Sequence, residues 1–435
     1  MAKLISADLT DNTKLIAADL TDNKLCILEY TTTGGQMLSF KKDAFDAKIV
    51  SHTYTDIGKV IFDKPITRIG DQAFDLCNSL TSVTIPDSVT TIGMCAFQDC
   101  NSLTSVTIGN SVTTIGKSAF WRCNSLTSVT IPDSVTTIGE YAFFYCPSLT
   151  SVTIPDSVTT IGQYAFFCCS SLTSVTIPDS VITIGDRAFS SCTSLTSVTI
   201  PDSVTTIGYC AFARCKSLKE FKGKFAADGG RCLIVDGVLN AFAIGCGVTQ
   251  YTIPDSVTTI GSDAFSSCAS LTSVTIPDGV TSIGNFAFWG CNSLTSVTIG
   301  NSVTTIGEEA FRGCSSLKEF KGKFAADGGR CLIMDGVLNA FVIGCGVTQY
   351  TIPDSVTTIG NWAFSGCKSL TSVTIGKSVS EIGKQAFKEC NIDTIVCCPK
   401  IPPILYDSFD KFENLIVPTG CEEAYANSDW GQYLE

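Results

Sequence analysis

Apolar and polar residues follow one repeated pattern along most of the chain. Residues 126–148 read LTSVTIPDSVTTIGEYAFFYCPS, and this 23-residue unit recurs with small changes from about residue 66 to residue 390. The isoleucine that follows Val-Thr forms a column with steps of 23 residues, interrupted by two steps of 53. Its members are Ile85, Ile108, Ile131, Ile154, Ile177, Ile200, Ile253, Ile276, Ile299, Ile352 and Ile375. The chain is therefore expected to be one array of similar units, with a cap or an insertion where the pattern breaks.

The alternation at the start of each unit predicts a short β-strand. Val129 and Ile131 would face one side of it, and Ser128 and Thr130 the other. Pro132 has no backbone N–H to donate, so the strand is expected to end there. A period of about 20–29 residues with apolar positions spaced L-x-x-L-x-L is typical of a leucine-rich-repeat solenoid. We therefore predict a right-handed leucine-rich-repeat superhelix, built mostly of short parallel β-strands with short helical or 3-10 turns.

One unit is too small to be stable alone. Burying a large apolar side chain contributes about 1.5–3 kcal/mol, whereas ordering the backbone costs about 1–2 kcal/mol for each residue. The units must therefore stack and be closed at both ends. We accordingly predict a β-rich N-terminal cap (residues 1–65), a solenoid (residues 66–391) and a C-terminal cap (residues 392–435), in which Tyr425 and Trp430 can cover the last coil.

The N-terminal cap begins with a smaller self-similarity, KLISADLTDNT, KLIAADLTDN and KLCILEY. These segments predict short strands joined by Asp-Asn turns. The strands either cover the first coil, which is the interpretation we favour, or attach the chain to a larger assembly.

The two long steps of the repeat contain the same insertion. Residues 218–253 and residues 317–352 differ only at Val235, which becomes Met334, and at Ala243, which becomes Val342. In each copy an Asp-Gly pair separates two apolar runs, which predicts a β-hairpin on a type I′ turn. That turn needs positive φ at both central residues, Asp236-Gly237 in the first copy and Asp335-Gly336 in the second. The hairpins are either structural elaborations, which we favour, or part of a binding edge.

The chain has 23 cysteines, and twelve of them form one column of the repeat. They are Cys77, Cys100, Cys123, Cys146, Cys169, Cys192, Cys215, Cys268, Cys291, Cys314, Cys367 and Cys390. Because side chains stacked in parallel point the same way, we interpret the column as reduced, buried thiols that do not pair as disulfides. Reduced thiols fit a reducing compartment. No metal site is expected, because the chain has no C-x-x-C motif and a single histidine.

Charge and hydropathy exclude several kinds of partner. The net charge of −12 argues against nucleic acid and anionic membranes, since both attract clustered Lys and Arg. The longest apolar stretch, residues 232–248, is interrupted by Asp236 and Asn240, so membrane insertion is not expected. The first residues, MAKLISADLTDNTKL, lack the apolar run of a secretory signal. Together with the reduced thiols, this start suggests a cytoplasmic location at synthesis.

Catalytic motifs are not evident. His52 is the only histidine and lies outside the repeats, and neither G-x-x-x-x-G-K-[ST] nor H-E-x-x-H occurs. The chain is therefore not expected to be an enzyme or to hold a cofactor. Successive I-P-D-S turns carry a column of carboxylates at Asp133, Asp156, Asp179 and Asp202. Such a column could bind calcium or form an acid–base pair; we prefer the interpretation that each Asp accepts a hydrogen bond from local backbone.

Variation among the copies is concentrated in the two residues after each Ile-Gly and the two residues between Ala-Phe and Cys. These positions should point to solvent, because the neighbouring Ala, Phe and Cys point inward. In three successive units they carry Trp121, Arg122, Tyr141, Phe144, Tyr145, Tyr164 and Phe167, and later units carry Tyr209, Phe286, Trp289 and Trp362. Exposed aromatic and Arg side chains in adjacent coils are typical of a partner-binding surface. Alternatively, the rings only pack over the edges of neighbouring coils.

The combined motif L-x-x-V-x-I-P-x-x-V-x-x-I-G-x-x-A-F-x-x-C resembles the BspA-like leucine-rich repeats of bacterial surface proteins, which are also found in some protists. The match covers about three quarters of the chain, and the ending NLIVPTGCEEAYANSDWGQYLE is similar to that of such proteins. The resemblance implies a non-catalytic surface or secreted protein that binds other proteins. The usual Asn of leucine-rich repeats is Ser in this sequence, as at Ser88, Ser134 and Ser157, so a buried Asn ladder is not expected.

The sequence therefore predicts a non-catalytic, adhesin-like scaffold that binds protein, or a glycan through its Ser and Thr strand face, and that is a monomer rather than an oligomer. The alternative is a structural component of a larger assembly, such as a virion or a surface appendage, docked through its N-terminal strands. The resemblance places the protein at the cell surface or outside the cell, whereas the thiols and the N-terminal residues favour the cytoplasm.

Overall fold

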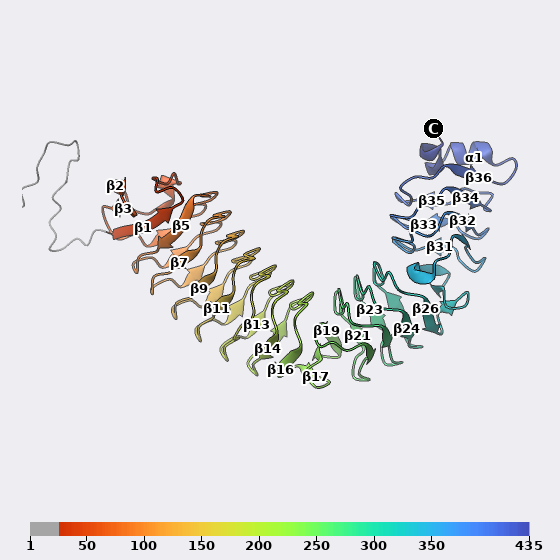
Figure 1. Ribbon diagram of the computed structural model, residues 1–435, viewed down its shortest axis with the longest axis horizontal. Helices are drawn as coiled ribbons and strands as arrows, with labels where there is room; N and C mark the ends of the chain where they lie inside the picture. Colours follow the sequence, from red (N-terminus) through yellow and green to blue (C-terminus); the bar gives the residue numbers. More distant parts are fainter. Residues whose placement is uncertain (1–25, 435) are drawn as a thin grey trace, which may run out of the picture.

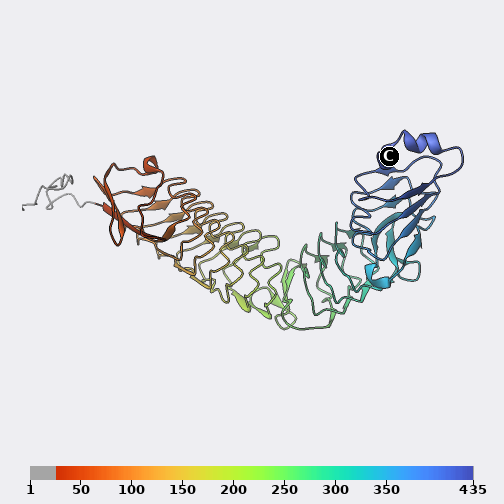
Figure 2. The same cartoon turned by 45° about the horizontal axis from the view of Figure 1, so that its top comes forward.

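The computed structural model describes residues 26–434. They form a β-solenoid of about 15 coils with little helix. Figures 1 and 2 show that the solenoid curves into an open arc, with one end of the described chain at each tip. The predicted solenoid of short parallel strands is confirmed. The N-terminal segments KLISADLTDNT and KLIAADLTDN lie outside the described residues.

The alternating segment forms the first strand of nearly every coil, and residues 173–176 are the exception among the described residues. Val152 lies opposite Val129 in parallel register, so each strand pairs with the same residues of the preceding unit. These strands are β5 (Leu80–Thr84), β7 (Ser105–Thr107), β9 (Ser128–Thr130), β11 (Ser151–Thr153), β14 (Ser197–Ile200), β16 (Glu220–Gly223), β20 (Gln250–Thr252), β22 (Ser273–Thr275), β24 (Ser296–Ile299), β26 (Glu319–Gly322), β30 (Gln349–Thr351), β32 (Ser372–Ile375), β34 (Thr394–Cys397) and β36 (Asn414–Ile416).

A second strand of two residues, which was not predicted from the sequence, follows in each regular coil and ends just before a Gly in all of them but the last. Ile138 lies opposite Ile115 and Ile161. These strands are β4 (Arg68–Ile69), β6 (Thr91–Ile92), β8 (Thr114–Ile115), β10 (Thr137–Ile138), β12 (Thr160–Ile161), β13 (Thr183–Ile184), β15 (Thr206–Ile207), β21 (Thr259–Ile260), β23 (Ser282–Ile283), β25 (Thr305–Ile306), β31 (Thr358–Ile359), β33 (Glu381–Ile382) and β35 (Ile404–Leu405). In Figure 1, β23 and β33 lie nearer the inside of the arc than β24 and β34.

Columns of identical side chains fill the space between the strands. In the first arm of the arc the buried phenylalanine rings are nearly parallel, with ring centroids 5.0–5.4 Å apart from Phe74 to Phe212. Beside them the cysteine thiols donate to backbone carbonyls; Cys146 Sγ lies 3.2 Å from the Phe120 oxygen. Burial raises the pKa of Cys146 to about 12, so the thiol stays protonated and can act as the hydrogen-bond donor. All 23 cysteines are free thiols.

The segment between the second strand and the cysteine, here called the inner loop, is a series of tight turns. Residues 139–146 form one such loop, in which Tyr141 and Tyr145 both have φ of 56°. The Tyr141 N–H donates to the Gln163 oxygen at 2.9 Å, and the Tyr145 N–H to the Phe167 oxygen at 2.8 Å. Because the backbone groups are satisfied by the next coil, the side chains at these positions are free to differ.

Each 53-residue step folds into two coils, a regular coil of 23 residues that ends at the partner of Ile200 or Ile299 in the next strand, and a coil of 30 residues that carries a hairpin. The first hairpin coil contains β17 (Ala226–Ala227), β18 (Cys232–Val235) and β19 (Val238–Phe242), and the second contains β27 (Ala325–Ala326), β28 (Cys331–Met334), β29 (Val337–Phe341) and the 3-10 helix η2 (Ile343–Cys345). The φ values of Asp236 and Gly237 are 50° and 75°, and those of Asp335 and Gly336 are 48° and 79°. The predicted type I′ turns are therefore confirmed.

The hairpin coils are also shorter than the others on the opposite side. In a regular coil the inner loop leads from Ile138 to Phe143, whereas in the first hairpin coil Leu239 pairs with Ile260 and leads directly to Phe242, two residues sooner. Phe242 still donates its N–H to the next coil and stacks in the phenylalanine column, 4.7 Å from Phe265. Each hairpin coil is consequently a wedge, wide at the hairpin and narrow at the inner loop. The arc bends at these two coils, with the inner loops on its concave side (Figure 1).

Both ends of the described solenoid are covered. At the first end, β1 (Cys26–Thr32) pairs antiparallel with both β5 and β3 (Gly58–Phe62). Strand β3 also pairs with β2 (Ile49–Tyr54), and the 3-10 helix η1 (Lys42–Ala44) lies between β1 and β2 in the sequence. At the last, α1 (Glu422–Ala426) and the 3-10 helix η3 (Asp429–Tyr433) bury Tyr425 and Trp430 completely, as expected. The boundaries at 65/66 and 391/392 remain predictions.

Candidate functional site

The seven residues predicted as a surface come together on three adjacent inner loops. We call them the aromatic patch: Trp121, Arg122, Tyr141, Phe144, Tyr145, Tyr164 and Phe167. Tyr141 stacks on Tyr164 with centroids 4.9 Å apart, and Phe144 stacks on Phe167 at 5.0 Å. Trp121 packs against both columns, 5.5 Å from Tyr141 and 4.9 Å from Phe144. The rings are half-buried by one another, and Tyr145 remains 45% exposed.

Three basic side chains, one of them Arg122 of the patch itself, contact the rings of the aromatic patch. Lys117 lies 5.5 Å from the Tyr141 centroid, and Arg122 lies 5.9 Å from that of Tyr145. Arg187 lies 5.7 Å from the Tyr164 centroid and donates a 3.0 Å hydrogen bond to its hydroxyl. Such cation–π contacts hold rings and cations in place before any partner arrives. Lys117 and Arg187 were not predicted as part of this surface, although both occupy the same variable positions, directly after Ile-Gly or one residue later.

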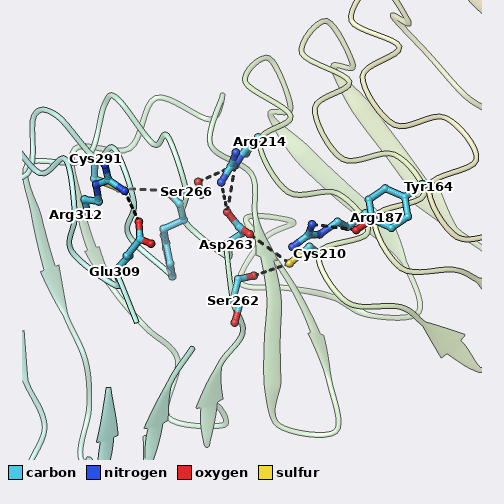
Figure 3. Close-up of polar contacts among 11 residues, drawn as sticks. Tyr164, Arg187, Cys210, Arg214, Ser262, Asp263, Ser266, Cys291, Glu309 and Arg312 are labelled. Atoms are coloured by element: carbon cyan, nitrogen blue, oxygen red, sulfur yellow. Dashed lines mark hydrogen bonds and ion pairs between the residues drawn. The ribbon is translucent and has the colours of Figure 1, made fainter. Parts of the chain in front are cut away.

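The inner loops of the two coils that flank the first hairpin coil contact each other, because the inner loop of the hairpin coil between them is two residues shorter. Figure 3 shows the Arg214 side chain directed at Asp263 and Ser266. Its Nη2 lies 2.8 Å from Asp263 Oδ1, and its Nε lies 3.1 Å from Ser266 Oγ. The same guanidinium stacks on Trp289, 4.6 Å from its centroid. Asp263 is buried, so this contact joins the two arms of the arc at its narrow side.

The second hairpin coil is bridged differently. Arg312 stacks on Trp362 at 4.3 Å and pairs with Glu309 at 2.8 Å in its own coil. Its other nitrogen lies 3.3 Å from Glu389, beyond the hairpin coil. The two predicted tryptophans, Trp289 and Trp362, are thus half-covered by arginines that stand near the bends.

The other candidate chemistries do not gather into a site. The four aspartates of the I-P-D-S column are exposed, and their carboxylates accept no hydrogen bond within residues 26–434, so the preferred interpretation was wrong for them. Stacked carboxylates repel one another and turn toward solvent. The acceptor is used where the next coil has Asn, as between Asp87 and the Asn110 N–H at 2.8 Å. The serine that follows bonds instead to the backbone of the preceding coil: Ser157 Oγ donates to the Val135 oxygen at 2.6 Å.

His52 belongs to the N-terminal cap. Its Nε2 lies 2.6 Å from the Tyr30 hydroxyl, and burial, together with the charge of Lys42, lowers its pKa. A neutral imidazole against Phe40 and Tyr30 serves packing. Within residues 26–434, no cluster of three or more His, Cys, Asp or Glu is placed to hold a metal, and no helix is long and apolar enough to cross a membrane.

The stacked coils, the paired strand columns and the variable inner loops define a leucine-rich-repeat solenoid. A family model for the BspA-type leucine-rich repeat region matches residues 46–169, 136–225, 239–324 and 338–428. The chain therefore belongs to the BspA-type leucine-rich-repeat family, as the resemblance implied. No curated protein matches the sequence.

Several solved structures are similar to the chain. A leucine-rich cell surface protein from Faecalibacterium prausnitzii is 27% identical, with a TM-score of 0.52, and the match covers 92% of this chain and 97% of that one. A leucine-rich repeat protein from Bacteroides ovatus is also 27% identical, with a TM-score of 0.46 and coverage of 87% and 98%. One from Eubacterium ventriosum is 25% identical, with a TM-score of 0.47 and coverage of 62% and 84%.

Proposed function

We propose that this protein is a non-catalytic, adhesin-like scaffold that binds another protein through its aromatic patch. The observation that carries the proposal is a continuous layer of stacked rings, drawn from three coils and contacted by Lys117, Arg122 and Arg187. Trp, Tyr and Arg are the residues that most often dominate protein interfaces.

The shape and order of the patch favour a protein over a small molecule. The rings form a layer and not a cavity, so an extended partner surface is needed to cover them. Their mutual stacking fixes the side chains before binding, which reduces the entropy lost on association. The patch also lies on the concave side of the arc, where one partner could contact the inner loops of several coils.

Display outside the cell and a monomeric state belong to the same proposal. Display is supported by the similarity to the cell surface protein of F. prausnitzii. A monomer is consistent with a solenoid whose described ends are both covered by caps, because covered ends do not offer a coil for stacking.

The test is an affinity pull-down with identification of the bound proteins. The wild-type chain is compared with a variant in which Tyr141, Phe144, Tyr145, Tyr164 and Phe167 are all replaced by Ser. Ser is compatible with these backbone positions, since Ser118, Ser190 and Ser191 occupy them in other coils. A protein that binds the wild type and is lost from the variant supports the proposal.

The matched control replaces Leu76 and Tyr209, which are 62% and 47% exposed on inner loops outside the patch, by Ser. The control should keep the partner, and circular dichroism should show that both variants fold. A partner that survives in the patch variant, or the absence of any partner, contradicts the proposal.

The alternative, a structural component docked through its N-terminal strands, would use β2. This strand is the edge of its sheet among the described residues, and its Val50 is 43% exposed. An edge strand can pair with another chain. Native mass spectrometry separates the two functions, because a defined oligomer favours the alternative and a monomer favours the binding scaffold.

A further inference from the structure

A groove of about 820 Å³ runs along the concave side of the arc, past both hairpin coils. Its lining extends from Lys216, before the first hairpin coil, and Gly245, within it, to Ser365 and Glu389, beyond the second hairpin coil. Its volume lies in the range of about 300–1,000 Å³ that is usual for ligand sites. The aromatic patch contributes none of its residues, so the two surfaces are separate.

The floor of the groove is open because three inner loops carry glycine at the position before the cysteine. Gly290, Gly313 and Gly366 stand directly before the cysteine, the position that Arg122 and Tyr145 occupy in the first arm. The backbone is left-handed in both arms, with φ of 67–82° at the glycines and 56° at Arg122 and Tyr145. Packing does not demand glycine at this position, since a Cβ on Gly366 would meet no atom within 4 Å.

One wall of the groove is aromatic. Arg214 covers Trp289 from outside the groove, while Trp289 itself contributes to the lining. A tryptophan fixed by such a contact offers a rigid apolar surface beside open space. The C–H faces of a pyranose ring pack well on a surface of this kind.

The polar wall is close to electrically neutral. Arg312 is already paired with Glu309 and Glu389, and the polar lining also includes Lys216, Asn292 and several serines. At Arg312 an anionic ligand would have to displace one of the two glutamates, and a wholly apolar ligand would leave these groups without partners. A neutral ligand with many hydroxyl groups can bond to them without either cost.

Ser365 adds an unmet hydrogen-bonding requirement to this wall. The residue is 2% exposed, and its Oγ has no hydrogen-bond partner among the described residues. Its counterpart beside the first hairpin coil, Ser266, accepts a hydrogen bond from Arg214. A buried hydroxyl without a partner is uncommon, and a ligand hydroxyl in the groove would supply one after a rotation of the side chain.

We propose that this groove binds a neutral carbohydrate chain, with a sugar ring packed against Trp289 and its hydroxyl groups bonded to Arg312, Glu389 and Asn292. The site differs in place and in chemistry from the aromatic patch, and the proposal does not depend on protein binding there. It also differs from the Ser and Thr strand face, which lies on the other sheet.

Calorimetric titration with cellohexaose, maltohexaose, chitohexaose and mannohexaose tests the proposal, with hexagalacturonate as an acidic counterpart. The informative variant is Gly366→Tyr, which places in the groove the side chain that Tyr145 carries at the same position of the first arm. We expect at least one neutral hexasaccharide to bind, and to bind about tenfold or more weakly to Gly366→Tyr and to Trp289→Ala. Quenching of tryptophan fluorescence is expected in the wild type and not in Trp289→Ala.

The matched control is Trp121→Ala, which removes a ring of similar size from the aromatic patch and should leave carbohydrate affinity unchanged. Thermal unfolding checks that Gly366→Tyr folds, and Trp289→Phe gives a milder second variant, expected to fall between wild type and Trp289→Ala. The proposal is overturned if no neutral probe binds at millimolar concentration, if Gly366→Tyr binds as wild type does, or if hexagalacturonate binds more tightly than every neutral probe.

Discussion

The two arms of the arc use the same backbone positions for different surfaces. In the first arm, the variable positions of the inner loop hold Tyr141, Phe144 and Tyr145, and the result is a layer of rings. In the second arm, the position of Tyr145 is taken by glycines such as Gly313, and the result is a groove. The inward phenylalanines and cysteines hardly change between the arms. The repeat thus separates residues that make the fold from residues that can carry a function.

That separation has a physical basis in the hydrogen bonds of the inner loop. The N–H of Tyr145 bonds to the next coil, and so does the N–H of Gly290, which donates to the Arg312 oxygen at 2.8 Å. Whichever side chain is present, the backbone is satisfied in the same way. A candidate site in such a protein is therefore found by asking where the copies disagree.

The largest expected effect tests this separation at two neighbouring residues of one loop. Phe143 is completely buried between Phe120 and Phe166, so Phe143→Ala should destabilise the protein by about 3–5 kcal/mol. Phe144 is only half-buried, in the layer of rings outside the core, and Phe144→Ala should cost no more than about 1 kcal/mol. Urea unfolding followed by circular dichroism measures both. Equal losses would show that the rings of the patch are part of the core.

A smaller effect is expected where the arms meet. Arg214→Ala leaves the buried Asp263 carboxylate without its partner and should cost about 1–3 kcal/mol, allowing for the partial exposure of the arginine. Arg312→Ala should cost less, about 1 kcal/mol, because one of its carboxylate partners, Glu389, is 53% exposed.

Small-angle X-ray scattering on the same pair of variants reports the shape. Arg214→Ala should open the arc and increase the radius of gyration more than Arg312→Ala does. If the order is reversed, the ion pair at the first bend is not what holds the arms in place.

The smallest effect concerns the thiols, which run through both arms alike. Burial raises the pKa of Cys146 in the first arm well above the ordinary value, and a hydrogen bond with Cys314, together with burial, raises the pKa of Cys291 in the second. Native protein at pH 8 should therefore react with a disulfide reagent at the exposed Cys398 and leave both column cysteines unlabelled until the chain unfolds. Mass spectrometry of the labelled peptides gives the order in which the cysteines react. Early labelling of Cys291 alone would show that the second arm opens more readily.

Much of the fold was predictable because the pattern is repeated many times. The first strand, the inward faces of Val129 and Ile131, the cysteine column and the type I′ turn at Asp236-Gly237 all follow from local rules that tertiary contacts do not oppose. The second strand was missed, since a Thr-Ile pair is too short to show a period. Its pairing depends on neighbouring coils.

The candidate surfaces were predictable to different degrees. Aromatic residues at one variable position in three successive units indicate a patch, and the rings do stack. The groove could not be predicted, because its floor consists of absent side chains and its walls meet across a hairpin coil. The contact between Arg214 and Asp263 depends on the two residues missing between Leu239 and Phe242, and their absence becomes visible only when the Phe column is aligned in space.

Because each hairpin coil lacks two residues in its inner loop, the curvature of the molecule depends on the number of hairpin coils. Each hairpin coil changes the direction in which the coils stack, whereas the regular coils between two hairpin coils mainly add length. Tandem duplication of the 99-residue segment that ends with a hairpin coil would therefore add one further bend and close the arc toward a ring, and loss of both hairpin coils would leave a nearly straight rod. A lineage that gains or loses such segments can change the width of its concave face without redesigning any side chain of the core.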